Sequence, residues 1–530
     1  MFKEYIVSLK RDVDYDTFWQ EIETDTTSNG FVPARPVEII NNRDASLRSC
    51  HYSLTDDEAK LLQNDSRVYS VEIPPEQRTD IQIGFRGKQS GNFTKTSSSS
   101  GNFKNWGLKR IGEATNVYGT STAAPDDIYK YILDGTGVDV VIQDSGIEPT
   151  HPEFKDDTGT SRVQQINWYT ASGIGGTQNA NHYRDYDGHG THVAGIVTGK
   201  TFGWAKNARI YSLKINGLEG AGDSGTGISI TDCFDVIKLW HRNKPIDPNT
   251  GFKRPTIVNM SWGYRLTYTD VTSLTYRGVT YSDASTTTDA AYRWTNYGLV
   301  NLTSGADFVS NYRLGSVDTD IQEMFDEGIH VVVAGGNNYH KISIPGEVDY
   351  NNYFTTAGSD YYYHRGSSPL DEDVLKVGSI DSSVYSSSLD QKASSSETGP
   401  GIDVFAPGAN VVSACSNTNS FSGVAYNLDS SFKQVNLSGT SMAAPQVCGL
   451  GAIYLQLNPG VSPKELKKWF VTKAVSNATI YTSGLSNDYT NTRSLMGGNT
   501  RFLFNPFNIE SDANLSGDVT LQNGAFTLNK

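Results

Sequence analysis

The chain has 530 residues, of which 37% are hydrophobic, 11% aromatic and 19% charged, and its formal net charge at pH 7 is −14. This apolar content is sufficient for a large core, so the composition excludes a wholly disordered chain. The acidic balance and the lack of a cluster rich in Lys and Arg argue against a nucleic-acid-binding protein, because such proteins neutralise many phosphates.

The sequence has few features of an exported, membrane-spanning or disulfide-bonded protein. No apolar run approaches the length of about 18 residues that spans a bilayer, so we expect no membrane span. Residues 1–16 lack the apolar core of a secretory signal peptide, which predicts an intracellular or virion-associated protein. The cysteines are widely spaced without a C-x-x-C pair, a pattern typical of reduced thiols rather than of disulfides or zinc. They are Cys50, Cys233, Cys415 and Cys448.

Residues 1–74 predict a small α+β domain. Its elements have the order β-α-β-β-α-β, and such a unit closes into a four-stranded antiparallel sheet with two helices on one face. The second helix is well marked, because Thr55 and Glu58 form a capping box ahead of an apolar run. The expected strands are 5–9, 36–40, 50–54 and 68–73, and the first helix is expected over 15–21. Residues 75–105 are polar and of low complexity, and we expect a linker that contains a processing site.

Residues 106–508 predict an α/β domain. Short β-branched runs alternate with helical segments, which indicates a mostly parallel sheet covered on both faces. The expected strands are 138–142, 210–215, 256–260, 330–334 and 374–377. Two stretches near 264–307 and 339–371 are rich in Tyr, Thr, Ser and Gly, and we expect surface insertions there. Residues 509–530 form a polar tail.

Three segments carry residues suited to catalysis. Asp144 ends a buried strand, where α/β sheets assemble their sites, although an aspartate there also caps turns. His189 stands between two glycines before a helix of small residues, and histidine is the natural general base near neutral pH. Together with His192 it could be read as a metal ligand, but two histidines without a nearby Glu or Cys are weak evidence for zinc, which we reject. Ser441 opens a helix, where a serine is either a nucleophile beside free N–H groups or an ordinary N-cap.

The three residues together form the orienting acid, base and nucleophile of acyl transfer. The motifs D-S-G-I at 144–147, H-G-T-H-V-A-G at 189–195 and G-T-S-M-A-A-P at 439–445 resemble those of the subtilisin-like serine proteases, the subtilases. The resemblance implies a three-layer α/β fold and a serine endopeptidase in which Asp144, His189 and Ser441 form the triad. It implies protein or peptide substrates and no cofactor for the chemistry.

Further segments extend the resemblance over about 106–508. Ala334–Asn337 is similar to the strand whose asparagine donates to the oxyanion, so Asn337 is the expected oxyanion donor, with Gly335 and Gly336 beside it. By resemblance, two backbone edges should bind an extended peptide, namely Ser224 and Gly225 on one side and Ser261, Trp262 and Gly263 on the other. Trp262 is either a side chain that narrows a subsite or plain core packing.

The chain also departs from the family pattern. Gln446 stands where the family has histidine, and Cys448 where a small residue is usual. Residues 198–206 are similar to the shorter form of proteinase K-like enzymes, which implies that the calcium loop of many subtilisins is absent. Other structural calcium sites cannot be assigned from sequence, because a hard cation needs six or more oxygens in a geometry that sequence does not show.

Residues 1–74 are similar to the inhibitory propeptide of subtilases, in 5–10, 54–59 and 68–72. The resemblance implies a self-inhibited zymogen whose propeptide is a partner of the catalytic domain. An unrelated ferredoxin-like module is the alternative for this domain. For the whole chain the alternative is a structural or binding protein on a subtilase scaffold, such as a phage virion component, which the missing signal peptide, the insertions and the tail motivate.

Overall fold

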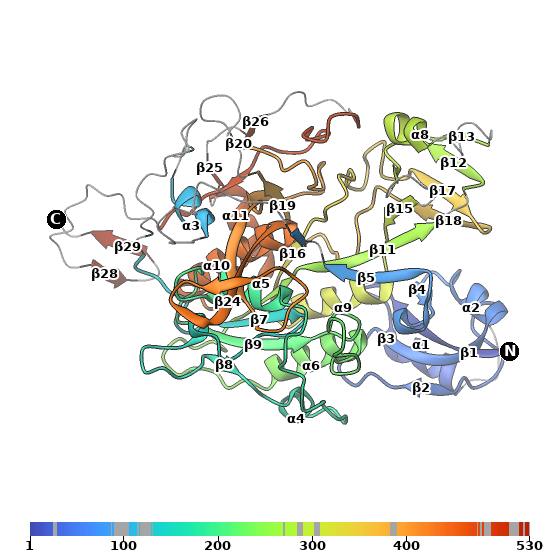
Figure 1. Cartoon of the computed structure of the whole chain (residues 1–530). Coiled ribbons are helices and arrows are strands. Elements are labelled where there is room, and N and C mark those ends of the chain that lie inside the picture. Colours follow the sequence, from blue (N-terminus) through green and yellow to red (C-terminus); the bar gives the residue numbers. More distant parts are fainter. Residues whose placement is uncertain are drawn as a thin grey trace.

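A computed structural model describes the chain over most of its length (Figure 1). The described residues are 1–24, 29–85, 87–89, 105–113, 116, 129, 131–268, 271–282, 290–301, 308–381, 390–473, 475–476, 480–481, 489–507, 519–522 and 525–528. Much of the expected linker lies outside them.

The N-terminal domain has the predicted element order and topology. Its elements are β1 (Phe2–Leu9), α1 (Tyr15–Glu23), β2 (Ile39–Asn41), β3 (Ser49–Thr55), α2 (Asp56–Leu62) and β4 (Val68–Glu72). The sheet is antiparallel with the order β2-β3-β1-β4, and the helices bury Phe18, Ile22 and Leu62 in its core. The predicted capping box is present, since the Glu58 N–H donates to Thr55 and the Thr55 N–H donates to Glu58.

The large domain is built on a nine-stranded sheet that is parallel except at one edge, which confirms the predicted α/β class. Its strands in spatial order are β25 (Val475–Ser476), β27 (Phe502–Leu503), β21 (Val404–Pro407), β19 (Leu375–Ile380), β16 (His330–Ala334), β10 (Thr256–Met260), β7 (Asp139–Asp144), β9 (Arg209–Lys214) and β8 (Val163–Gln164).

Helices cover both faces of this sheet. On one face lie α5 (His189–Thr198) and α10 (Thr440–Leu457), in a core that includes Val140 and Ile142 of β7. On the other face lie α6 (Ile230–Arg242) and α9 (Gly315–Asp326), in a core that includes Val141. Successive residues of a strand point to opposite faces, so the apolar run at residues 140–142 of β7 reflects burial on both sides. Within the described part of the chain, no helix is long and apolar enough to cross a membrane.

The two expected insertions fold together and are not merely surface segments. Together with the residues that border the first of them, they contain β11 (Trp262–Tyr268), β12 (Ser273–Tyr276), β13 (Val279–Tyr281), α8 (Ala290–Tyr297), β14 (Val300–Asn301), β15 (Phe308–Asn311), β17 (Tyr353–Thr356) and β18 (Ser359–Tyr362). Strand β12 of the first insertion pairs with β17 of the second, and Tyr268 stacks on Phe354 at 4.0 Å. The aromatic residues supply the apolar surface for this additional layer.

Shorter elements complete the described structure. They are the 3-10 helices η1 (Pro75–Gln77) and η2 (Pro152–Phe154), and β5 (Ile81–Phe85), β6 (Gly87–Gln89), α3 (Trp106–Ile111), α4 (Trp168–Ser172), β20 (Asp390–Gln391), β22 (Val411–Cys415), β23 (Val424–Tyr426), β24 (Asp429–Gly439), α11 (Pro463–Thr472), β26 (Ile480–Tyr481), β28 (Val519–Gln522) and β29 (Ala525–Leu528). Figure 1 shows the N-terminal domain against α9 and α6, at a distance from the β28–β29 pair in the tail. The four cysteines are buried free thiols.

Candidate active site

The fold brings an aspartate, a histidine and a serine to the carboxyl edge of the sheet. Asp144 is the last residue of β7, His189 is the first residue of α5, and Ser441 lies in the first turn of α10. His189 Nδ1 lies 2.9 and 3.1 Å from the two Asp144 carboxylate oxygens, and both side chains are buried. This contact fixes the orientation of the imidazole ring.

Gly190 allows this close approach. A Cβ atom at position 190 would lie 2.1 Å from the Gly146 carbonyl oxygen and 3.1 Å from Asp144 Oδ1. Any other residue at 190 would therefore push α5 away from the loop that follows β7. The glycine after the histidine is a packing requirement of the Asp144–His189 pair.

A buried carboxylate that the sequence analysis missed holds these two loops together. Asp185 accepts hydrogen bonds from the Ser145 hydroxyl at 2.8 Å, the Gly188 N–H at 2.8 Å and the Thr191 N–H at 2.9 Å. Burial raises the pKa of Asp185 to about 6. In the sequence, Asp185 stands four residues before His189. Nothing in its local pattern distinguishes it from a loop residue exposed to solvent.

The two histidines of the motif have opposite electrostatic environments. Burial lowers the pKa of His189, but the charge and hydrogen bond of Asp144, with the charges of Asp187 and Asp185 behind it, more than offset this, so the pKa is raised above its ordinary value. His192 Nε2 lies 3.1 Å from two carbonyl oxygens, so this nitrogen must be the donor, and burial lowers the pKa of His192 to about 3. His192 is a structural residue that ties α5 to β22 and β24.

Ser441 is a helical residue and not an N-cap, because the cap position of α10 is Gly439. Its hydroxyl donates to the Ser261 carbonyl oxygen at 3.0 Å, and the Ser261 hydroxyl donates back to the Ser441 carbonyl oxygen at 3.1 Å. Asn259 Nδ2 donates to the Ser261 hydroxyl at 2.9 Å. These bonds join the start of α10 to the start of β11.

Asn337 is bound to the first residue of α10 through its side-chain oxygen. Its Oδ1 accepts from the Thr440 N–H at 2.9 Å and from the Thr440 hydroxyl at 3.1 Å. The Thr440 hydroxyl in turn accepts from the Gly336 N–H at 3.0 Å, and the Gly335 N–H donates to the Val377 carbonyl. Because its oxygen is engaged, Asn337 has its Nδ2 group available as a donor beside the first turn of α10.

A segment of the chain itself crosses the site. Strand β5 pairs antiparallel with β11, with Phe85 opposite Trp262 and Gly84 opposite Gly263. Strand β6 pairs antiparallel with β24, with Gly87 opposite Gly439. One residue separates β5 from β6, and Ser441 follows Gly439 by two residues. Figure 1 shows β5 lying along β11.

The other residues expected to bind substrate differ in how they are placed relative to β5. In the described strands, β5 pairs with β11 only, and Ser224 and Gly225 lie in a turn before α6. Gly217 lies next to Ile83 of β5. The Trp262 side chain is fully buried against Phe234 and Tyr264, so packing is its role and its backbone alone faces β5.

Gln446, the departure from the family pattern, anchors the start of the catalytic domain. Its Nε2 donates to Asn105 Oδ1 at 2.7 Å, and its Oε1 accepts from Asn105 at 3.0 Å and from Trp204 Nε1 at 2.7 Å. Asn105 caps α3 through the Gly107 N–H. Among the side chains that the structure describes, no group of three or more His, Cys, Asp or Glu residues could hold a metal ion.

The sequence is similar to a known protein family and to individual proteins. The sequence profile of the Subtilase family matches residues 135–500. Extracellular serine proteinase of Thermus sp. (strain Rt41A) is 26% identical over 433 residues, covering 82% of this chain and 72% of that protein. Proteinase R of Parengyodontium album is 27% identical over 352 residues, covering 66% of this chain and 60% of that protein.

A solved structure extends the likeness to the fold of nearly the whole chain. The crystal structure of fervidolysin from Fervidobacterium pennivorans, a keratinolytic enzyme related to subtilisin, superposes with a TM-score of 0.50 at 17% identity. The match covers 96% of this chain, and this chain spans 60% of that one.

Proposed function

Because the chain belongs to the subtilase family of serine peptidases, we propose that it is a serine endopeptidase, made as a self-inhibited zymogen that cuts its own chain between β5 and β6. One observation carries the proposal. The strands on either side of residue 86 are held by β11 and β24, the two segments that flank Ser441. Strands β5 and β6, which follow the N-terminal domain and are called its tail from here on, therefore lie where an extended substrate would bind.

The strand register supports Arg86–Gly87 as the bond that is cut. Phe85, the residue before position 86, lies opposite Trp262, the residue after Ser261. The Ser261 carbonyl is the group that holds the Ser441 hydroxyl. Gly87 begins the strand on β24, on the other side of the nucleophile.

Three side chains would carry out the reaction. Ser441 Oγ attacks the carbonyl carbon of residue 86, and its proton passes to Nε2 of His189. Asp144 keeps the Nδ1 proton of His189 in place and stabilises the imidazolium. His189 then protonates the amine of Gly87 as the C–N bond breaks, and water hydrolyses the acyl-enzyme by the same route.

The developing negative charge needs donors that are already in position. Asn337 Nδ2 and the Ser441 N–H at the start of α10 are the two candidates, and one such donor contributes about 3 to 4 kcal/mol to transition-state stabilisation. The bonds to Thr440 orient Asn337 before substrate binds. The Ser441 hydroxyl must rotate from the Ser261 carbonyl towards His189 for attack.

Contacts of the N-terminal domain support the inhibited state. Arg43 Nη2 lies 2.8 Å from Asp235 of α6 and 2.5 Å from Asp320 of α9, and its side chain is buried. Glu72 accepts from the Gly315 and Ser316 N–H groups at the start of α9, both at 2.9 Å. A carboxylate at a helix N-terminus is stabilised by the helix dipole. The domain is thus docked on two helices while its tail lies in the site.

The test compares the wild-type full chain with Ser441→Ala, and uses Ser430→Ala, an exposed serine in β24, as the control. A fluorophosphonate probe should label the wild type and the control at Ser441. Intact mass should show loss of residues 1–86 in both, with a new N-terminus at Gly87. Ser441→Ala should stay unlabelled and uncut.

Two outcomes contradict the proposal. Cutting of Ser441→Ala at the same bond would remove Ser441 from the mechanism. An unlabelled and uncut wild type would favour the binding scaffold over the protease.

A further inference from the structure

The tail presents one apolar face to the catalytic domain. Ile81 is 5% exposed and Ile83 is half-buried, whereas Gln82 between them is exposed. Gln82 Oε1 accepts from Arg265 on the outer side, at 3.3 Å. Because strand side chains alternate, Ile81 and Ile83 share the inner face of β5.

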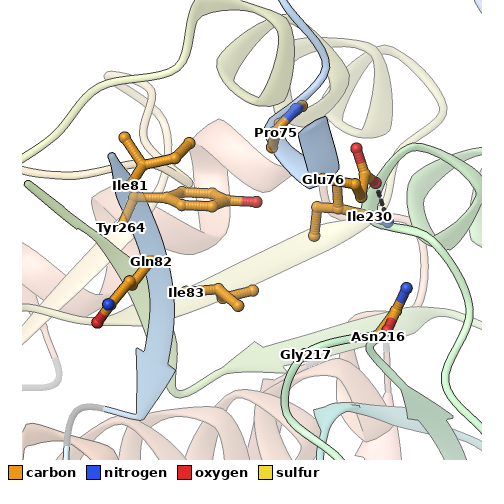
Figure 2. A pocket seen from close by; sticks show the side chains of 9 residues that line it. All are labelled: Pro75, Glu76, Ile81, Gln82, Ile83, Asn216, Gly217, Ile230 and Tyr264. Atoms are coloured by element: carbon orange, nitrogen blue, oxygen red, sulfur yellow. Dashed lines mark hydrogen bonds between the residues drawn. The ribbon is translucent and has the colours of Figure 1, made fainter. Parts of the chain in front are cut away.

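These two isoleucines enter a cavity of about 360 Å³ between the tail and the catalytic domain. Figure 2 shows the ring of Tyr264 lying between the Ile81 and Ile83 side chains, with Ile230 on the far side. A Cβ atom at Gly217 would lie 3.2 Å from Ile83 Cγ2, and the φ angle of Gly217 is +94°, which favours glycine. The glycine thus leaves room for the side chain at position 83.

Strand β15, which directly follows the first insertion, supports the wall of this cavity. Strand β15 pairs with the outer edge of β11 from Arg265 to Tyr268, so β11 continues well beyond Gly263. Tyr264 and Leu266 of β11 are almost fully buried, and the Tyr264 ring packs edge-on against Trp262 at 5.9 Å. The extended strand is therefore a fixed platform, and β5 pairs with it as far as Ile81 opposite Leu266.

From this arrangement we infer that the extension of β11 into the first insertion lengthens the substrate cleft, and that the enzyme selects an aliphatic residue at the sixth position before the cut bond, in a subsite beyond the one that takes the fourth. Tyr264 is the residue that separates and shapes the two subsites. The inference rests on the proposed function for the numbering of positions from the bond. The cavity has space beyond the two isoleucines, so Leu or Met at either position should also be accepted.

The first experiment measures cleavage of internally quenched peptides by the full chain after self-processing. The parent peptide has the sequence of residues 79–91, and its variants carry Ile81→Ser, Ile83→Ser or Gln82→Ser. Each isoleucine change should lower kcat/KM by about tenfold or more, because a buried aliphatic side chain is lost. Gln82→Ser should change it by less than about twofold. Equal values for Ile81→Ser and Gln82→Ser, with the parent cleaved, would overturn the inference and leave the proposed function standing.

The second experiment does not depend on catalysis. In the uncut Ser441→Ala full chain, hydrogen exchange of the β5 amides is compared between Ile81→Ser and Gln82→Ser. Ile81→Ser should speed exchange in β5 by about tenfold, while Gln82→Ser should leave it unchanged. If both variants exchange alike, Ile81 does not hold the tail in the cleft, whether or not the chain is a protease.

Discussion

The N-terminal region meets the catalytic domain in two places that are built from different interactions. The domain itself is held by buried charges, with Arg43 between Asp235 and Asp320, and Lys238 beside them. The tail is held by backbone pairing of β5 with β11 and of β6 with β24. The first contact depends on individual side chains, and the second depends mainly on main-chain atoms.

This difference separates recognition of the inhibitor from recognition of substrate. A buried ion network tolerates no change of partner, because removal of one member leaves another charge desolvated. Main-chain pairing accepts many sequences, and only the pockets for alternate side chains discriminate among them. Cutting between β5 and β6 would free the tail and leave the ionic contact whole, so release of the domain is a second, separate step.

The largest expected effect is the loss of catalysis in a variant that keeps both the ionic contact and the strand pairing. Asp144→Asn should slow self-cleavage by about 10⁴-fold, because an amide favours the wrong tautomer of His189. The uncut chain should unfold at the same temperature as Ser441→Ala, since neither contact is touched. Intact mass over time and thermal unfolding measure the two quantities. Self-cleavage within tenfold of the wild-type rate would show that Asp144 does not orient the base.

The ionic contact can be weakened while the site stays intact. Arg43→Met leaves Asp235 and Asp320 with Lys238 as their remaining cation in the network. Loss of a buried ion partner costs about 3 to 5 kcal/mol, so the cut N-terminal fragment should dissociate at least about 100-fold faster. The measurement is the lag between self-cleavage and the appearance of peptidase activity.

Arg11→Gln is the matched control for Arg43→Met. Arg11 also pairs with α9, at 3.2 Å from Asp326, but both side chains are largely exposed. Exposed ion pairs contribute less than about 1 kcal/mol, so the lag should change by less than about fivefold. If Arg43→Met and Arg11→Gln behave alike, the buried network does not hold the inhibitor domain.

The elements and residues that lie in short contiguous motifs could be predicted from the sequence. Asp144, His189 and Ser441 each stand in a motif whose local geometry is fixed by neighbouring glycines, and parallel strands bring such motifs to one edge of the sheet. The small domain was predictable because each of its elements has its own local signal, such as the capping box at Thr55.

Contacts between distant segments could not be predicted in this way. The pairing of β12 with β17 joins two insertions whose polar composition gave no sign of a shared core. Asp185 has no motif of its own, and Gln446 reaches Asn105 only in the folded chain. Sequence patterns report local preferences, whereas these residues are defined by partners far along the chain.

The smallest expected effect is on the pH dependence of activity. It tests whether the ionic contact or the strand pairing changes the pKa of His189. The groups that raise the pKa of His189 are Asp144, Asp187 and Asp185, all in the catalytic domain. His189 must be neutral to accept the Ser441 proton, so activity is lost as pH falls through this raised pKa. The acid limb should therefore lie above the ordinary pKa of histidine and should be the same for self-cleavage and for peptide cleavage after release.

Asp187→Asn sharpens this test, because it removes one negative charge without touching the Asp144–His189 bond. The pKa of His189 should fall, and the acid limb of kcat/KM should shift to lower pH with little change in the plateau. The charge-neutral change Ser420→Ala removes the hydroxyl that donates to the carbonyl and carboxylate oxygens of Asp187, and is the control. An acid limb that moves when the N-terminal domain leaves, but not with Asp187→Asn, would mean that the ionic contact and the active site are electrostatically coupled.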